Sequence, residues 1–295
     1  MHGFVQTDVK VSVSVQTEVP NAHNRLGWRQ TWRETRGAGG DVSVQQRRRE
    51  IVRRLHRDGY VEATKLSREM GVDSSTIRRD LDCLVRDGQA ERTHGGARPV
   101  GGAALEIPYA IKEFEHRRQK VAIARRAASR VREGDSVILD SGSTTFQVAV
   151  ALRHVPELTF ITNDLRIATT LAAVPGVRLF LAGGELLNSV YTLTGPRAAD
   201  FFSDFSATWT FLGADAVDPA AGITNTNTLE VPVKRAMIAA SASTVVVADS
   251  TKFGTRTLAR VADLDEVDLL ITDPGLDRSR AAEYGSTLEI AELDG

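Results

Sequence analysis

The feature that most constrains this chain is a pair of short amphipathic helices with a tight turn between them, in residues 60–97. Apolar residues recur at helical spacing on both sides of the turn; they are Ala63, Leu66 and Met70, then Ile77, Leu81, Leu84 and Val85. Gly71 can adopt the positive φ that ends a helix, and Ser74 can cap the next one. The pattern predicts a helix-turn-helix, which places its second helix in the major groove of DNA.

The second helix offers a polar face to that groove. At about 100° per residue, with Ile77 in the core, four residues point directly away from it; they are Ser75, Arg79, Asp82 and Arg86. Arg79 lies near the helix N-terminus, where its guanidinium can pair with a guanine. Arg78 lies roughly a quarter turn from the core face, which favours a phosphate contact. The candidate DNA contacts of this helix are Ser74, Ser75, Thr76, Arg78 and Arg79.

A short wing follows, entered through Asp87 and Gly88. Its Gly-Gly pair is flanked by Arg92 and His94, which makes both residues candidates for contact with the phosphate backbone or the minor groove. Taken alone, the charged helix would be a solvated surface with an Arg–Asp pair. The turn before it and the wing after it favour DNA binding instead.

A further helical pattern covers residues 45–58, with Ile51, Val52 and Leu55 on the inner face. Its arginines either flank the DNA or keep the helix soluble; they are Arg47, Arg48, Arg49, Arg53, Arg54 and Arg57.

Residues 60–97 resemble the N-terminal domain of the DeoR family of bacterial transcriptional regulators, most specifically in the segments STIRRDL and RTHGGA. The resemblance implies double-stranded operator DNA as a partner. Charge supports this division of the chain, because residues 45–98 hold 13 Lys and Arg against 9 Asp and Glu, whereas residues 99–295 hold 19 against 25. A basic module joined to an acidic body fits DNA bound at one end only.

We therefore predict four parts: an extension over 1–44, disordered by composition, a winged helix-turn-helix over 45–98, a linker over 99–119 and an effector domain over 120–295. The extension could instead reflect a start codon placed too far upstream, or an extra arm that binds DNA or a partner.

The single cysteine, Cys83, excludes an intramolecular disulfide and a Cys cluster for zinc. No apolar run is long enough to span a membrane and no signal peptide is evident, so we expect a cytoplasmic protein.

From residue 120 onward, short apolar strands alternate with helix-length stretches, which predicts an α/β fold with a largely parallel sheet. Ligands of such sheets bind beyond the carboxyl ends of the strands. Polar or glycine-rich residues follow the predicted strands and supply most of the candidate effector contacts: Asp140, Gly142, Ser143, Thr144, Thr145, Asn163, Gly183, Gly184, Asp215 and Lys252.

The sharpest of these segments is SGSTT, residues 141–145, because Gly142 permits a tight turn and the helix that opens there directs backbone N–H groups at a phosphate. Lys252 could neutralise the same ligand. An ordinary Ser/Thr helix cap is the alternative for this segment. Gly183 and Gly184 are expected to allow close approach of the backbone, with a plain turn as the alternative. Glu230 and Lys234 are also candidates, in a segment that could close over the site, although their spacing of four also suits a pair across a helix.

Residues 120–273 resemble the DeoR-family effector domain, whose fold is similar to ribose phosphate isomerase and CoA transferases. The phosphate loop of the family matches Gly142, Ser143, Thr144 and Thr145, and its acid, Asn and Lys match Asp140, Asn163 and Lys252. The acid loop ending at Asp215 resembles that of the isomerases, but Ala216 stands where many relatives carry Gly.

The resemblance implies a repressor of a carbohydrate-use operon that is controlled by a phosphorylated sugar, without a catalytic role, cofactor or metal. Because helix-turn-helix proteins pair to match two half-sites, we expect a homodimer or homotetramer. The alternative is a sugar phosphate isomerase-like enzyme with an accessory DNA-binding module. A third possibility keeps the repressor and replaces the effector with a nucleotide or an unphosphorylated sugar.

Overall fold

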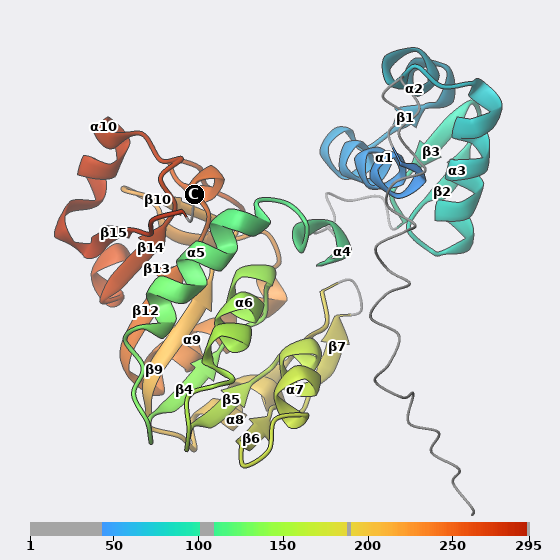
Figure 1. Ribbon diagram of the computed structural model, residues 1–295. Coiled ribbons are helices and arrows are strands. Elements are labelled where there is room, and N and C mark those ends of the chain that lie inside the picture. The colour runs from blue at the N-terminus through green and yellow to red at the C-terminus, as the bar shows by residue number, and fades with distance from the viewer. Residues whose placement is uncertain (1–42, 101–108, 188–189, 294–295) are drawn as a thin grey trace, which may run out of the picture. The chain divides into compact units, whose positions relative to one another are not determined.

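The computed structural model describes residues 43–100, 109–187 and 190–293 (Figure 1). The predicted extension, apart from its last two residues, and the middle of the predicted linker lie outside these ranges. Among the described residues, none of the helices combines the length and apolar character needed to cross a membrane. The same residues contain no group of three or more His, Cys, Asp or Glu side chains positioned to hold a metal ion.

The N-terminal module has the predicted helix-turn-helix and wing. Its elements are α1 (Val44–Asp58), β1 (Val61–Glu62), α2 (Ala63–Met70), α3 (Ser74–Arg86), β2 (Glu91–Thr93) and β3 (Gly96–Arg98). The three strands form an antiparallel sheet in the order β1-β3-β2. Apolar residues from all three helices and from the sheet are buried in one core that includes Ile51, Leu66 and Ile77. The helical periodicity of the sequence therefore identified this module correctly.

The turn between α2 and α3 differs from the prediction in one residue. Gly71 ends α2 with a φ of 65°, as expected of a glycine in the left-handed region. Ser74, however, does not cap α3, because it is already the first residue of that helix and Asp73 takes the preceding position without a side-chain cap. The Ser74 hydroxyl instead faces the hydroxyl of Ser67 in α2, at 3.4 Å.

A buried ion-pair cluster holds α1 against α3. The Asp80 carboxylate is 3% exposed and accepts from Arg47 Nε at 2.5 Å and from Arg48 Nε at 2.8 Å. The prediction that Arg47 flanks DNA or merely keeps α1 soluble is therefore wrong, as is the alternative of a solvated Arg–Asp pair for Asp80, whereas Arg48 is 34% exposed. Residue 80 faces inward because it lies next to Leu81 and three residues after Ile77 on the core side of the helix.

The larger part of the chain is built on a seven-stranded, entirely parallel sheet in the order β15-β14-β12-β9-β4-β5-β6 (Figure 1). The strands are β4 (Ser136–Leu139), β5 (Thr159–Thr162), β6 (Arg178–Leu181), β9 (Ala207–Gly213), β12 (Ser241–Val247), β14 (Leu269–Thr272) and β15 (Leu288–Ile290). The prediction of an α/β fold with a parallel sheet is confirmed, and only β15 was not anticipated.

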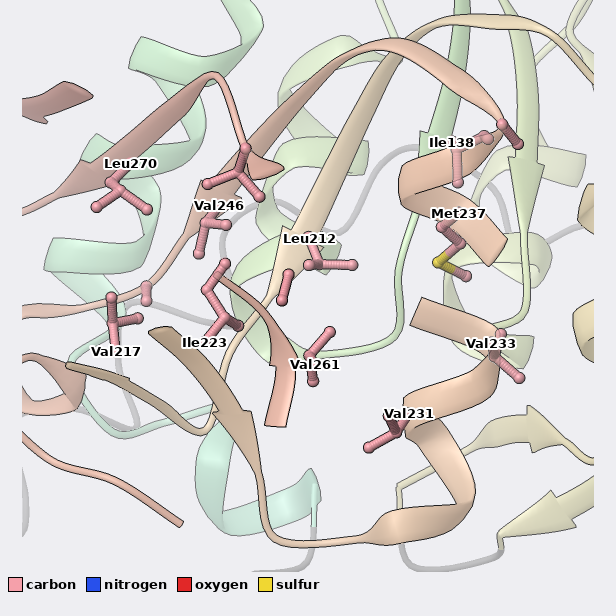
Figure 2. Packing of buried hydrophobic residues seen from close by; sticks show 14 of the residues in the cluster. Ile138, Leu212, Val217, Ile223, Val231, Val233, Met237, Val246, Val261 and Leu270 are labelled. Carbon is pink, nitrogen blue, oxygen red and sulfur yellow. The ribbon is translucent and has the colours of Figure 1, made fainter. Parts of the chain in front are cut away.

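Two apolar layers cover the sheet. Along β4, Val137 and Leu139 face one layer and Ile138 faces the other, as the alternation of a strand requires. The first layer contains α5 (Arg117–Ala128), α6 (Ser143–Leu152) and α7 (Leu165–Ala172). The second contains α8 (Pro196–Phe202), α9 (Val231–Ala239) and a small antiparallel sheet, and Figure 2 shows part of its packing.

The small sheet consists of β10 (Ala216–Asp218), β11 (Gly222–Asn225) and β13 (Ala259–Ala262). Its presence corrects the prediction that the segment after residue 222 is a loop closing over the site, because β11 is paired on both sides. Ala216, the departure from the family pattern, begins β10 and pairs with Thr224. A strand at this position accommodates a side chain without strain.

The remaining elements are short. They are α4 (Tyr109–Lys112), the hairpin of β7 (Glu185–Leu187) and β8 (Thr192–Thr194), α10 (Arg278–Ala281), and 3₁₀ turns at Thr228–Glu230, Ser250–Lys252, Leu264–Glu266 and Ala282–Thr287.

We expect the substitution Asp80→Ala to lower the free energy of unfolding by about 3 to 5 kcal/mol, because it leaves the buried Arg47 guanidinium without its carboxylate. The control is Asp82→Ala, which is also in α3 and removes an exposed partner of Arg92. It should lower the free energy of unfolding by less than about 1 kcal/mol. Denaturant unfolding of both full-length variants measures the difference. Equal losses in the two would contradict a stabilising role for the buried cluster.

Candidate functional site

A pocket lies at the carboxyl ends of β4, β9 and β12, the three central strands of the large sheet. This is the position at which open α/β sheets bind ligands. Seven of the twelve predicted effector contacts line it: Gly142, Ser143, Thr144, Asp215, Glu230, Lys234 and Lys252. They come from five separate loops or helices, which the sheet brings together.

The N-terminus of α6 opens into this pocket. Gly142 precedes the helix with a φ of 148°, and within the described part of the chain no side chain caps the first turn. The backbone N–H groups of that turn have no acceptor within the helix, so they are available to an anion. The alternative of an ordinary Ser/Thr cap is not what the structure shows, because the Thr145 hydroxyl donates to the Gly142 carbonyl at 2.9 Å and lies buried outside the pocket.

Lys234 and Asp140 form a buried ion pair beneath the pocket. The Lys234 ammonium donates to Asp140 Oδ2 and to the Gly213 carbonyl at 3.0 Å, and Asp140 also accepts from the Gly213 N–H at 2.9 Å. Burial alone would lower the pKa of Lys234, but the charges of Asp140, Glu230 and Asp215 and the hydrogen bond to Asp140 together outweigh burial and raise that pKa. Asp140 is 1% exposed and does not line the pocket, so its carboxylate is committed to the protein.

The predicted pairing of Glu230 with Lys234 as helix neighbours does not describe their main contacts. Lys234 pairs with Asp140, and Glu230 accepts a hydrogen bond from the Asn225 side chain. Both residues nevertheless line the pocket and are almost completely buried.

Asp215 lies on another wall of the pocket. Its carboxylate contacts the Lys112 ammonium at 3.3 Å and accepts from the Thr226 N–H at 2.9 Å. Burial acts to raise the pKa of Asp215, yet the Lys112 charge and this hydrogen bond together hold it well below its usual range. Asp215 is therefore a carboxylate at any pH near neutrality.

Lys252 differs from the other lysines of the pocket. Its ammonium makes no hydrogen bond or ion pair with any residue in the described part of the chain, whereas Lys112, Lys120 and Lys234 are each bonded to protein acceptors. Lys252 ends the 3₁₀ turn that follows β12 and is half-buried at the pocket. A cation in this position can neutralise an incoming anion without first breaking an existing bond.

Three predicted contacts lie away from the pocket, at the ends of β5 and β6. Asn163 is buried, where its side-chain amide donates to the Leu193 carbonyl at 3.1 Å and so ties β5 to β8. Gly184 has a φ of 147°, and a Cβ there would lie 2.3 Å from the Thr194 carbonyl oxygen. The close approach expected of Gly183 and Gly184 therefore occurs at Gly184, but toward the hairpin of β7 and β8.

The pocket also contains residues that the sequence analysis did not select. The largest group comes from the segment interpreted as the linker and the start of α5: Tyr109, Lys112, Glu115, His116 and Lys120. Lys120 donates to the carbonyls of Lys112 and Glu115, and burial lowers its pKa to about 8. The sequence signal that could have indicated the contribution of this segment to the pocket was Lys120, a charged residue on the inner face of a predicted helix. The others are the last residues of strands or lie in the segments after strands, and they are Ser141, Val190, Gly213, Ala214, Asn225, Val247, Ala248, Asp249 and Thr251.

In the helix-turn-helix, the outward face of α3 is as predicted. Ser75, Arg78 and Arg79 are exposed, and Ser74 and Thr76 are half-buried. In the wing, Arg92 pairs with Asp82 at 2.8 Å and donates to the Arg78 carbonyl at 3.2 Å. These contacts fasten the wing to α3. His94 is exposed at the tip of the hairpin, directly before Gly95, whose φ is 80°.

Both parts of the chain match the models of known protein families. The DeoR-like helix-turn-helix domain matches residues 47–100, and the DeoR C terminal sensor domain matches residues 115–274. Among solved structures, ribose 5-phosphate isomerase A from Methanocaldococcus jannaschii matches 47% of this chain and 55% of its own, with 16% identity and a TM-score of 0.35.

Full-length relatives are more similar in sequence. The HTH-type transcriptional regulator GlpR of Haloferax volcanii is 37% identical over 253 residues, which are 85% of this chain and 97% of that protein. The glycerol-3-phosphate regulon repressor of Escherichia coli K12 is 32% identical over 228 residues, 77% of this chain and 90% of its own. The two domain matches and these identities show that the chain belongs to the DeoR family of DNA-binding transcriptional regulators.

Proposed function

We propose that this regulator represses genes of carbohydrate use and that a phosphorylated sugar, bound at the carboxyl ends of β4, β9 and β12, controls its affinity for operator DNA. The observation that carries this proposal is that the N-terminus of α6 and the Lys252 ammonium face one pocket and that neither has a partner among the side chains that the structure describes. Two independent sources of positive potential directed at one space suit a phosphate. The hydroxyls of Ser143 and Thr144 add donors for its oxygens.

The remaining polar groups suit the sugar part of such a ligand. Asp215 stays ionised and can accept from hydroxyl groups, while Asn225 and Glu230 lie in the same pocket. The name of the Escherichia coli relative, glycerol-3-phosphate regulon repressor, associates that protein with a phosphorylated polyol. This agrees with the chemistry of the pocket and favours a sugar or polyol phosphate over a nucleotide or an unphosphorylated sugar.

We further propose that the protein is not an enzyme. Asp215, Glu230 and Lys252 are the plausible acid–base residues of an isomerase-like reaction, but Lys112 and the Thr226 N–H stabilise the charged form of Asp215 and lower its pKa. A carboxylate with so low a pKa is a weak general base. Turnover of ribose 5-phosphate by the purified chain would contradict this part of the proposal.

We also expect a homodimer or homotetramer, because two-fold pairing of the α3 helices matches two half-sites in DNA.

A thermal-shift screen of the full-length chain tests the proposed ligand class. Ribose 5-phosphate, glucose 6-phosphate and glycerol 3-phosphate should be compared with the corresponding unphosphorylated compounds. A ligand at about 100 times its Kd stabilises the folded state by about 2.7 kcal/mol, which gives a clear rise in Tm. Stabilisation by the unphosphorylated compounds alone would contradict the phosphate site.

Thr144→Ala and Lys252→Ala should each weaken the response to the stabilising sugar phosphate by about 10- to 150-fold, since each removes a donor to a charged group worth about 1.5 to 3 kcal/mol. Thr169→Ala is the matched control, because Thr169 is exposed in α7 and its hydroxyl bonds only to the Leu165 carbonyl. Titration of ligand-induced DNA release measures the effect. An intact response in both pocket variants would mean that the phosphate is bound elsewhere.

Arg79→Ala and Arg78→Ala test the DNA-binding face. The first should cost about 1 to 3 kcal/mol and relax the preference for one base, whereas the second should weaken binding to all sequences alike. Binding to a DNA fragment selected from a random pool, compared with binding to unselected DNA, separates the two effects. Equal losses on both DNAs for both variants would refute the assignment of Arg79 to base contact.

A further inference from the structure

The hydroxyl of Tyr109 is a buried polar group without a partner. Tyr109 begins α4 and is 1% exposed, and its hydroxyl makes no hydrogen bond within the described residues. Most buried hydroxyl groups in proteins are bonded, so an orphan of this kind calls for an explanation. Burial raises the pKa of Tyr109, which keeps the hydroxyl protonated and able to donate.

The ring of Tyr109 is held firmly even though its hydroxyl is not. It makes edge-to-face contacts with Phe146 and Tyr191, at centroid distances of 6.3 and 5.9 Å. The Arg166 guanidinium lies over the face of the Tyr109 ring, with its Cζ 4.2 Å from the ring centroid. Glu113 accepts two hydrogen bonds from this guanidinium and so holds it in place. Apolar packing alone would be served equally well by phenylalanine, so the packing does not account for the hydroxyl.

Tyr109 also lines the pocket that contains the N-terminus of α6 and Lys252. We propose that the Tyr109 hydroxyl donates a hydrogen bond to the phosphorylated ligand and thereby makes α4 part of the ligand-bound state. This inference rests on the proposed function and adds to it a specific contact and a route for regulation. Because the hydroxyl is inaccessible to water in the ligand-free protein, a shift of α4 accompanies the contact.

The position of α4 in the chain connects this contact to the DNA-binding module. Tyr109 is the first described residue after the gap at residues 101–108, and Lys112, in the same short helix, contacts Asp215, which also lines the pocket. Lys120 binds the carbonyls of Lys112 and Glu115 and so connects α4 to α5. A ligand that moves Tyr109 therefore acts on the segment that leads directly along the chain to the DNA-binding module.

The test is the Tyr109→Phe variant of the full-length chain, which keeps the ring and removes the orphan hydroxyl. Its Tm without ligand should equal that of the wild type or exceed it, because no native hydrogen bond is lost. Its affinity for the sugar phosphate that stabilises the wild type should fall about tenfold or more, with DNA affinity in the absence of ligand unchanged. The concentration of that sugar phosphate needed to release DNA should rise by the same factor.

Tyr284→Phe is the matched control. The Tyr284 hydroxyl accepts from the Gly254 N–H at 2.9 Å and donates to the Val217 carbonyl at 3.0 Å, so it has a structural role. We expect this variant to lose stability without ligand and to keep the ligand-induced rise in Tm, the reverse of Tyr109→Phe.

The outcomes separate this inference from the proposed function. If no sugar phosphate shifts the Tm of the wild type, the proposed function fails and this inference with it. If the wild type responds and Tyr109→Phe responds equally, the phosphate site stands and the Tyr109 contact is refuted. A loss of stability in ligand-free Tyr109→Phe as large as that of Tyr284→Phe would also refute it, because the hydroxyl would then have a partner within the protein.

Discussion

The buried pair of Lys234 and Asp140 is the interaction on which the geometry of the pocket depends. It joins α9 to the carboxyl end of β4, and the backbone of Gly213 at the end of β9 bonds both side chains. Removal of either partner would leave an uncompensated buried charge, which is strongly destabilising. The pair therefore sets the separation of the two central strand ends, and the turn at Gly142 begins two residues beyond Asp140.

This arrangement divides the charged groups of the pocket into those that build it and those that remain available. Lys234 is neutralised by Asp140, Lys112 contacts Asp215, and Lys120 is bonded to two backbone carbonyls. Lys252 has no such commitment within the described residues, and neither does the first turn of α6. An anion that enters the pocket thus meets positive potential without displacing the ion pair that holds the strands. Recognition and structural support are assigned to different lysines.

The sequence predicted the fold more completely than it predicted the site. Helical periodicity identified α2 and α3, and apolar runs identified six of the seven strands of the large sheet, because burial patterns are local properties of the chain. Seven of the twelve residues selected as effector contacts line the pocket, but the segment interpreted as the linker and the start of α5 supply a further group. The expectation that residues after each strand line the pocket failed at Asn163 and Gly184, because β5 and β6 lie toward one edge of the sheet. The order of the strands cannot be predicted from the sequence of any one strand.

The sequence by itself determined that the chain has a helix-turn-helix, a parallel α/β sheet and a glycine-containing turn opening a helix, since each depends on residues close together in the chain. Only the tertiary structure decided the roles of the charged side chains. Asp80 belongs to a segment that reads as a solvated Arg–Asp surface in the sequence, and Asp140 was expected to contact the effector. Each is instead buried against arginines or a lysine that are distant along the chain. Tyr109 likewise becomes a pocket residue only through folding. The role of a polar group depends on its burial and on its partners, and long-range packing sets both.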